Sequence, residues 1–112
     1  MTSKQAYEAR SKELHKAAMK YDKATAKFRA KFQMIDEWHT GIMCKHEKAY
    51  SARNRNPKAF KVFKKAEETL RQAWDKWYKA SSIRDAKCEP FGKIWDRERQ
   101  KIYKKYQKFI RD

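Results

Sequence analysis

Glycine and proline are scarce in this chain of 112 residues, which contains two of each. Because these residues are the commonest signals for turns and helix ends, their scarcity predicts few turns and long regular elements. The length is sufficient for one domain with one hydrophobic core. We therefore assign residues 1–112 to a single helical domain.

Long hydrophobic runs are also missing. No stretch approaches the roughly 18 uninterrupted apolar residues of a membrane span, so none is expected. Residues 1–20 contain no apolar segment after a basic start, which predicts that there is no secretory signal. We expect a cytoplasmic protein, or one associated with a nucleoid or, if viral, located inside a host cell. In such a compartment Cys44 and Cys88 are expected to be reduced thiols.

Acidic residues are outnumbered, with 14 Asp and Glu against 30 Lys and Arg, which gives a net charge of +16. The excess is uneven: residues 41–65 carry eight basic and one acidic side chain, whereas residues 66–90 carry five of each. Self-repulsion of this size destabilises a compact state, so a chain that tolerates it is expected to bind an anionic partner.

Motifs of catalysis and metal binding are absent as well. The sequence has no glycine-rich phosphate loop, nucleophile motif or catalytic carboxylate pair. Cys44 and His46 are two residues apart, which suits a shared metal poorly on a helix, and no cysteine or histidine spacing matches a zinc site. We expect no enzymatic activity, no metal and no cofactor.

An apolar seven-residue repeat runs through the first part of the chain. Its members are Tyr7, Leu14, Tyr21, Phe28, Ile35 and Ile42. A repeat of this length predicts a helix packed lengthwise on other helices, as in a coiled coil. We expect this helix at about residues 3–52, capped by Thr2 or Ser3, with a break near Gly41 as the alternative.

Asn56 and Pro57 mark the clearest turn, because Asn caps helices and Pro favours the first helical position. We expect a helix at about 57–86 and, since Pro90 ends or kinks a helix, another at about 90–111. The fold class is therefore all-α, either a long antiparallel helical hairpin with a kinked second arm or a three-helix coiled-coil-like bundle. A seam this long can also close between chains, as a homodimer.

The strongest candidate site is a group of cations around this turn, where a helix N-terminus adds a positive field and free N–H groups for a phosphate. Its members are Lys45, Lys48, Arg53, Arg55, Lys58, Lys61, Lys64 and Lys65.

A second candidate lies in the last helix, where Tyr103 falls among cations and offers a ring for stacking on an exposed base. The predicted anion-binding residues there are Arg97, Arg99, Lys101, Lys104, Lys105 and Lys108, with Lys93 and Arg111 nearby. A lysine row at positions 16, 20, 23 and 27 is more typical of the solvated outer face of a coiled coil.

These observations favour a non-catalytic protein that binds nucleic acid, DNA or RNA, through its phosphate backbone. The alternative is a small basic regulator or inhibitor, of a type that viruses also make, that docks on an acidic protein or on the nucleic-acid channel of a larger enzyme. Binding to a membrane surface ranks third, because no broad apolar face is left outside the predicted core.

Overall fold

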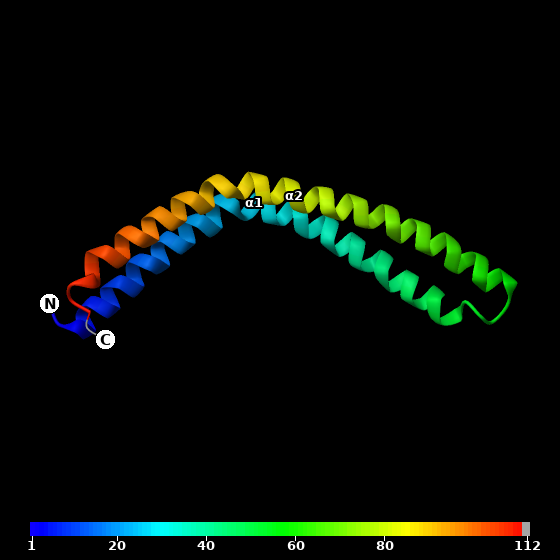
Figure 1. Ribbon diagram of the computed structural model, residues 1–112, viewed down its shortest axis with the longest axis horizontal. Coiled ribbons are helices and arrows are strands. Elements are labelled where there is room, and N and C mark those ends of the chain that lie inside the picture. The colour runs from blue at the N-terminus through cyan, green and yellow to red at the C-terminus, as the bar shows by residue number, and fades with distance from the viewer. Residues whose placement is uncertain (111–112) are drawn as a thin grey trace. The chain divides into compact units, whose positions relative to one another are not determined.

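Two long helices account for most of residues 1–110, which are the residues that the computed structural model describes (Figure 1). Helix α1 spans Ser3–Ala52 and helix α2 spans Pro57–Gln107, with a short turn between them. The described part of the chain has no strand, which confirms the all-α class. Two helices joined by one turn are consistent with the helical hairpin, whereas a three-helix bundle is not observed among these residues.

The N-terminus of α1 is closed by a reciprocal pair of hydrogen bonds. The Gln5 backbone N–H donates to Thr2 Oγ1 at 3.1 Å, and the Thr2 backbone N–H donates to Gln5 Oε1 at 3.0 Å. This is a capping box, which satisfies two backbone donors that a helix start otherwise leaves unpaired. Of the two candidate caps, Thr2 is the one that the chain uses.

The turn forms where Asn56 and Pro57 predicted it. Asn56 Oδ1 accepts a hydrogen bond from the Ala59 backbone N–H at 2.8 Å, and Pro57 occupies the first position of α2. At the end of α1, the Arg53 backbone N–H and Nη1 both donate to the Tyr50 carbonyl oxygen, at 3.3 and 2.7 Å. Side chains thus satisfy both helix ends that flank the turn.

The expected separation of helices at 57–86 and 90–111 is wrong, because α2 continues through Pro90 to Gln107. Proline cannot donate to the carbonyl four residues earlier and costs a helix interior about 3 kcal/mol. Here the chain after Pro90 packs against α1: Phe91 and Trp95 line one groove together with Tyr21. Packing on α1 offsets the local cost, so the helix is retained.

Gly41 does not break α1 either, and the expectation of one long helix at residues 3–52 is confirmed. A glycine in a helix interior costs about 1 kcal/mol relative to alanine. The apolar repeat continues across it, with Ile35 and Ile42 both half-buried. The tertiary contacts of the seam therefore outweigh one weak position.

Contacts between the helices fall into two units, which we describe separately. Unit 1 contains residues 1–27 and 86–110, and unit 2 contains Phe28–Asp85. Each unit is a pair of antiparallel helix segments, one from α1 and one from α2. The assignment of the whole chain to one domain stays a prediction.

Aromatic rings form the core of unit 2. Phe63 is 8% exposed and lies 5.6 Å from the ring of His46. Further from the turn, His39 is fully buried against Trp74, with 4.1 Å between ring centres. Trp77 Nε1 donates to Asp36 Oδ1 at 2.8 Å, which joins α2 to α1 by a half-buried hydrogen bond.

Smaller side chains fill the core of unit 1. Ala6, Ala17 and Tyr106 are buried, as is Thr25, whose hydroxyl donates to the Tyr21 carbonyl oxygen at 3.0 Å. Alanine on a seam allows two helix backbones to approach closely, which suits the pairing of α1 with the bulkier residues of α2.

Many large apolar side chains remain exposed in both units. They include Tyr7, Met19, Met34, Trp38, Tyr50, Phe60, Val62, Tyr78, Ile83, Ile94 and Tyr103. A pair of helices has one shared interface, so apolar residues beside that interface stay in contact with water. The structure thus has a narrow core and large apolar side chains on the surface of both units.

We predict that Phe63→Ala lowers the free energy of unfolding by about 3–5 kcal/mol, because it empties a buried ring site that three other rings contact. Urea unfolding followed by circular dichroism measures the change. Val62→Ala is the matched control: Val62 is 56% exposed, and a change within about 0.5 kcal/mol is expected. Equal losses of stability in the two variants would contradict the core position of Phe63.

Candidate functional site

The basic residues predicted around the turn all lie in unit 2, on the last turns of α1, the connecting segment and the first turns of α2. We call this group the turn cluster: Lys45, Lys48, Arg53, Arg55, Lys58, Lys61, Lys64 and Lys65. Arg53 is half-buried, and the other seven are exposed. Glu47 is the single acidic residue within this stretch. The turn cluster is therefore a continuous segment of accessible positive charge.

Two members of the turn cluster already have partners. The Arg53 guanidinium lies over the Tyr50 ring, 3.7 Å from its centre, and bonds the carbonyl at the end of α1. Lys64 Nζ lies 3.5 Å from Glu67 Oε1, with both side chains well exposed. Exposed pairs of this kind contribute little, typically below about 1 kcal/mol, so a stronger anion can replace Glu67.

The N-terminus of α2 offers less to a phosphate than expected. Asn56 takes the Ala59 N–H with its side chain and the Phe60 N–H with its carbonyl oxygen, at 2.8 and 3.2 Å. Pro57 has no N–H to give. Free backbone donors were part of the predicted site, and the cap uses most of them. Anion binding at this end therefore falls to the cationic side chains.

A second basic surface lies on α2 in unit 1, where all six predicted cations are exposed. Four of them recur at intervals of four, three and four residues and share one helix face; we call them the C-terminal row: Arg97, Lys101, Lys104 and Lys108. At 1.5 Å per residue the row extends over about 16 Å. The four residues can be recognised in the sequence by this spacing, which the other two predicted cations of the region, Arg99 and Lys105, do not share.

The other two predicted cations of this region are engaged in ion pairs. Arg99 contacts Asp96 at 3.3 Å, and Lys105 Nζ lies 2.8 Å from Glu13 Oε1 on α1. Lys93, the nearby cation, contacts Glu89 at 3.4 Å. Arg111 lies outside the described residues. The accessible charge of this surface is therefore concentrated in the C-terminal row.

The Glu13–Lys105 pair joins the two helices of unit 1. The Lys105 ammonium, and after it the Tyr106 hydroxyl, holds the pKa of the Glu13 carboxyl below its usual value. Glu13 in turn raises the pKa of Lys105. Glu13 Oε2 is buried without a hydrogen-bond partner, whereas Glu13 Oε1 accepts a hydrogen bond from Lys105 Nζ.

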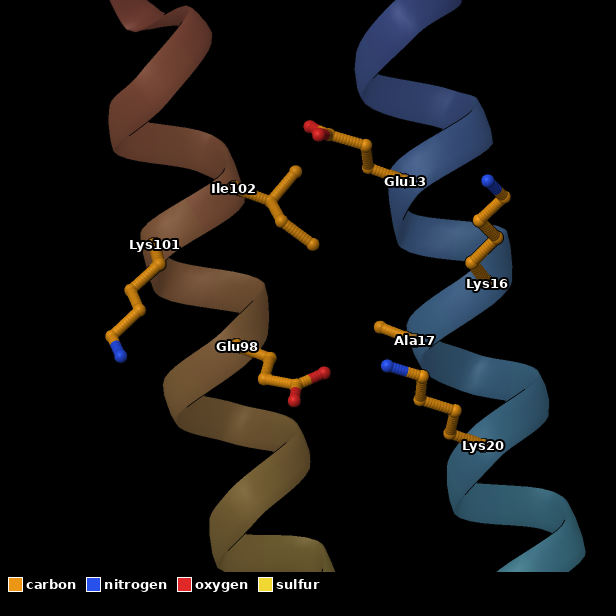
Figure 2. A pocket seen from close by; sticks show the side chains of 7 residues that line it. All are labelled: Glu13, Lys16, Ala17, Lys20, Glu98, Lys101 and Ile102. Atoms are coloured by element: carbon orange, nitrogen blue, oxygen red, sulfur yellow. The ribbon is translucent and has the colours of Figure 1, made fainter.

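A groove runs between the helices of unit 1 beside this pair, with a volume of about 320 Å³ at one end. Figure 2 shows Ile102 and Glu98 extending from α2 toward Ala17 and Lys20 of α1. A smaller hollow of about 140 Å³ shares these α1 residues and continues to Trp95. The groove thus has an apolar floor with lysines at its edge, including two of the lysine row on α1.

Two aromatic residues lie in the same segment of the chain as the turn cluster. Tyr50 is 49% exposed and Phe60 is 45% exposed, and both contact the buried ring of Phe63. The sequence places Tyr50 next to Ala49, where the seven-residue repeat continues from Ile42, and it does not by itself show whether such a neighbouring ring is buried. Tyr50 and Phe60 are exposed because they lie beside the shared interface of the two helices and not within it.

Within residues 1–110 no three histidine, cysteine or acidic side chains are grouped in a way that would hold a metal ion. Cys44 is exposed and Cys88 half-buried, and both are free thiols. His39 is enclosed by tryptophan rings, and its Nε2 has no hydrogen-bond partner. None of the described helices has a segment apolar and long enough to span a bilayer.

Comparisons with models of known protein families, with curated proteins and with solved structures found no match to this chain. Function must therefore be argued from the chain itself. Its accessible features are the turn cluster, the C-terminal row and the groove of unit 1.

A double-mutant cycle of Glu13→Gln and Lys105→Gln tests the link across unit 1. Because the folded pKa of Glu13 is lowered, its contribution to stability is present above the unfolded value of 4.5 and is lost as pH falls through the folded pKa. The pKa of Lys105 is raised in the folded state, so the contribution of Lys105 to stability is lost at high pH, as pH rises through that pKa.

We therefore expect a favourable coupling energy in urea unfolding at pH 7 that vanishes once Glu13 is protonated in acid and weakens in high salt. A coupling of the same size at both pH values would show that the pair contributes through packing and not through charge.

Proposed function

We propose that this chain is a non-catalytic nucleic-acid-binding protein that contacts the phosphate backbone with its turn cluster. The observation that carries the proposal is the density of accessible cations there: residues 45–65 contain eight basic residues, seven of them exposed, and one acidic residue, Glu47. A polyanion relieves the mutual repulsion of these charges and releases its own counterions on binding.

The C-terminal row supports the same proposal from the other unit. Regularly spaced cations along one helix face match the repeated charges of a nucleic-acid strand. Lysines contact phosphates without reading base edges, so affinity is expected to vary little with sequence. Because the two surfaces belong to different units, we treat each as a separate contact region.

Binding should fall steeply with salt, and selected lysines should set the slope. We predict that Lys58→Gln with Lys61→Gln weakens binding to a labelled oligonucleotide and flattens the plot of log affinity against log salt. The slope should change by about 0.7–0.9 for each phosphate that the variant no longer neutralises. Fluorescence anisotropy between about 50 and 200 mM salt measures both effects.

Lys79→Gln with Lys87→Gln is the matched control, since it removes the same charge from exposed positions in the electrically balanced segment. The proposal requires this control to bind more like the parent. Equal weakening by both double variants would show that total charge, and not the turn cluster, governs binding. Affinity that does not change with salt would exclude the electrostatic mechanism altogether.

A second candidate function is docking on an acidic protein, or in the nucleic-acid channel of a larger enzyme, as a regulator or inhibitor. The groove of unit 1 favours it, because its apolar floor suits an amphipathic segment, and three lysines (Lys16, Lys20 and Lys101) line it against two carboxylates (Glu13 and Glu98). A second copy of this chain fits the groove less well, since each copy carries a net charge of +16.

For this second candidate, we predict that Ile94→Ser lowers the recovery of a partner protein in a pulldown after nuclease treatment. Ile94 is 51% exposed and lines the groove. Ile83→Ser is the control, because Ile83 is 53% exposed but belongs to unit 2. If nuclease treatment removes every captured protein, or if both variants behave alike, the groove is not the docking site.

A further inference from the structure

We propose that Tyr50 and Phe60 form a stacking site for unpaired bases within the turn cluster, so that the preferred ligand is single-stranded DNA or RNA. This inference rests on the proposed nucleic-acid binding and specifies its ligand. Proteins that bind single strands without sequence preference combine cations that follow the backbone with aromatic rings on which bases stack.

The two rings are anchored on one side and open on the other. Their ring centres lie 5.8 Å and 6.2 Å from that of Phe63, which is buried between the helices. Both residues are nevertheless nearly half exposed to solvent. Contact with a fixed core residue restricts the motion of both rings, which lowers the entropic cost when a base stacks on them.

Each exposed ring has a cation over one of its faces, which a base or its phosphate can contact. The Arg53 guanidinium lies 3.7 Å from the centre of the Tyr50 ring, and Lys64 Nζ lies 5.6 Å from that of Phe60. A nucleotide likewise presents its phosphate and its base close together, on one sugar. A phosphate bound by Arg53 or Lys64 therefore brings the attached base near an aromatic face. The Lys64–Glu67 pair is solvent-exposed and yields readily to a phosphate.

Unpaired bases are required because duplex bases are stacked on each other and shield their faces. Any base can stack on a ring, so the site is expected to accept different sequences, in DNA and RNA alike. Duplex of equal charge would contact the cations of the turn cluster but leave the two rings unused.

Other exposed aromatic residues fit this role less well. Tyr103, near the C-terminal row, shares one cation with Tyr7, because the Arg10 guanidinium lies 5.0 Å and 4.4 Å from the two ring centres. Tyr78 is 61% exposed and stacks on Trp74, but it belongs to the segment whose charges balance. Tyr50 and Phe60 combine two anchored, exposed rings with surplus positive charge.

The test compares a labelled oligothymidylate with an abasic oligonucleotide of the same length, which carries the same phosphates but no bases. The parent chain should bind oligothymidylate at least about tenfold more tightly, as one stacked base would provide. Tyr50→Leu with Phe60→Leu should remove that advantage while retaining apolar volume, affinity for the abasic strand and the salt slope. Oligouridylate should behave as oligothymidylate does.

Two controls keep the result specific. Tyr78→Leu, a ring outside the turn cluster, should leave the preference intact, and Tyr50→Phe with Phe60 unchanged should keep it because the ring is retained. Circular dichroism confirms that each variant is helical, and the fluorescence of a 2-aminopurine base reports stacking directly by quenching in the parent and not in the double leucine variant.

The outcomes separate this inference from the function on which it rests. If the parent binds the abasic strand as tightly as oligothymidylate, or if the double leucine variant keeps the preference, the stacking site is overturned. Lys58→Gln with Lys61→Gln would still weaken binding in that case, and backbone recognition would stand. If the parent binds neither strand in a salt-dependent way, the proposed nucleic-acid binding fails as well.

Discussion

A helix that has one neighbouring helix can bury one stripe of its side chains, and the remainder of its surface stays in water. This limit applies to both units of the chain. The buried residues are few and mostly small in unit 1, where Ala6 and Ala17 allow close approach, and aromatic in unit 2, around Phe63 and His39. A narrow core explains why large apolar side chains remain exposed next to a seam that is regular over its whole length.

The narrow core also makes the self-repulsion of the positive charges more important for stability. With a net charge of +16 and little buried area, the folded chain has a small reserve of stability against its own repulsion. An anion bound at the turn cluster neutralises charge where it is densest, and any ligand that prefers the folded state also stabilises it. Under the proposed function, the same cations would link folding to binding.

The arrangement also determines which cations are available. Glu13 and Lys105 are 92 residues apart in the sequence and meet across unit 1, which engages Lys105 in an ion pair although its side chain stays exposed. The four members of the C-terminal row share a helix face by spacing alone and were all among the predicted residues. Ion pairs between helices depend on register, however, and register depends on packing along the whole seam.

From the sequence alone, the heptad repeat and the Asn56-Pro57 signal determined the all-α class, the extent of α1 and the position of the turn, because periodicity and capping are local properties. The tertiary structure decided that α2 continues through Pro90, since its packing on α1 outweighs a missing backbone hydrogen bond. It also decided that Tyr50 and Phe60 are exposed. Periodicity is a property of the sequence that identifies which stripe of side chains faces the partner helix. The exposure of a ring beside that stripe depends instead on how much of it the partner covers, which only the folded chain shows.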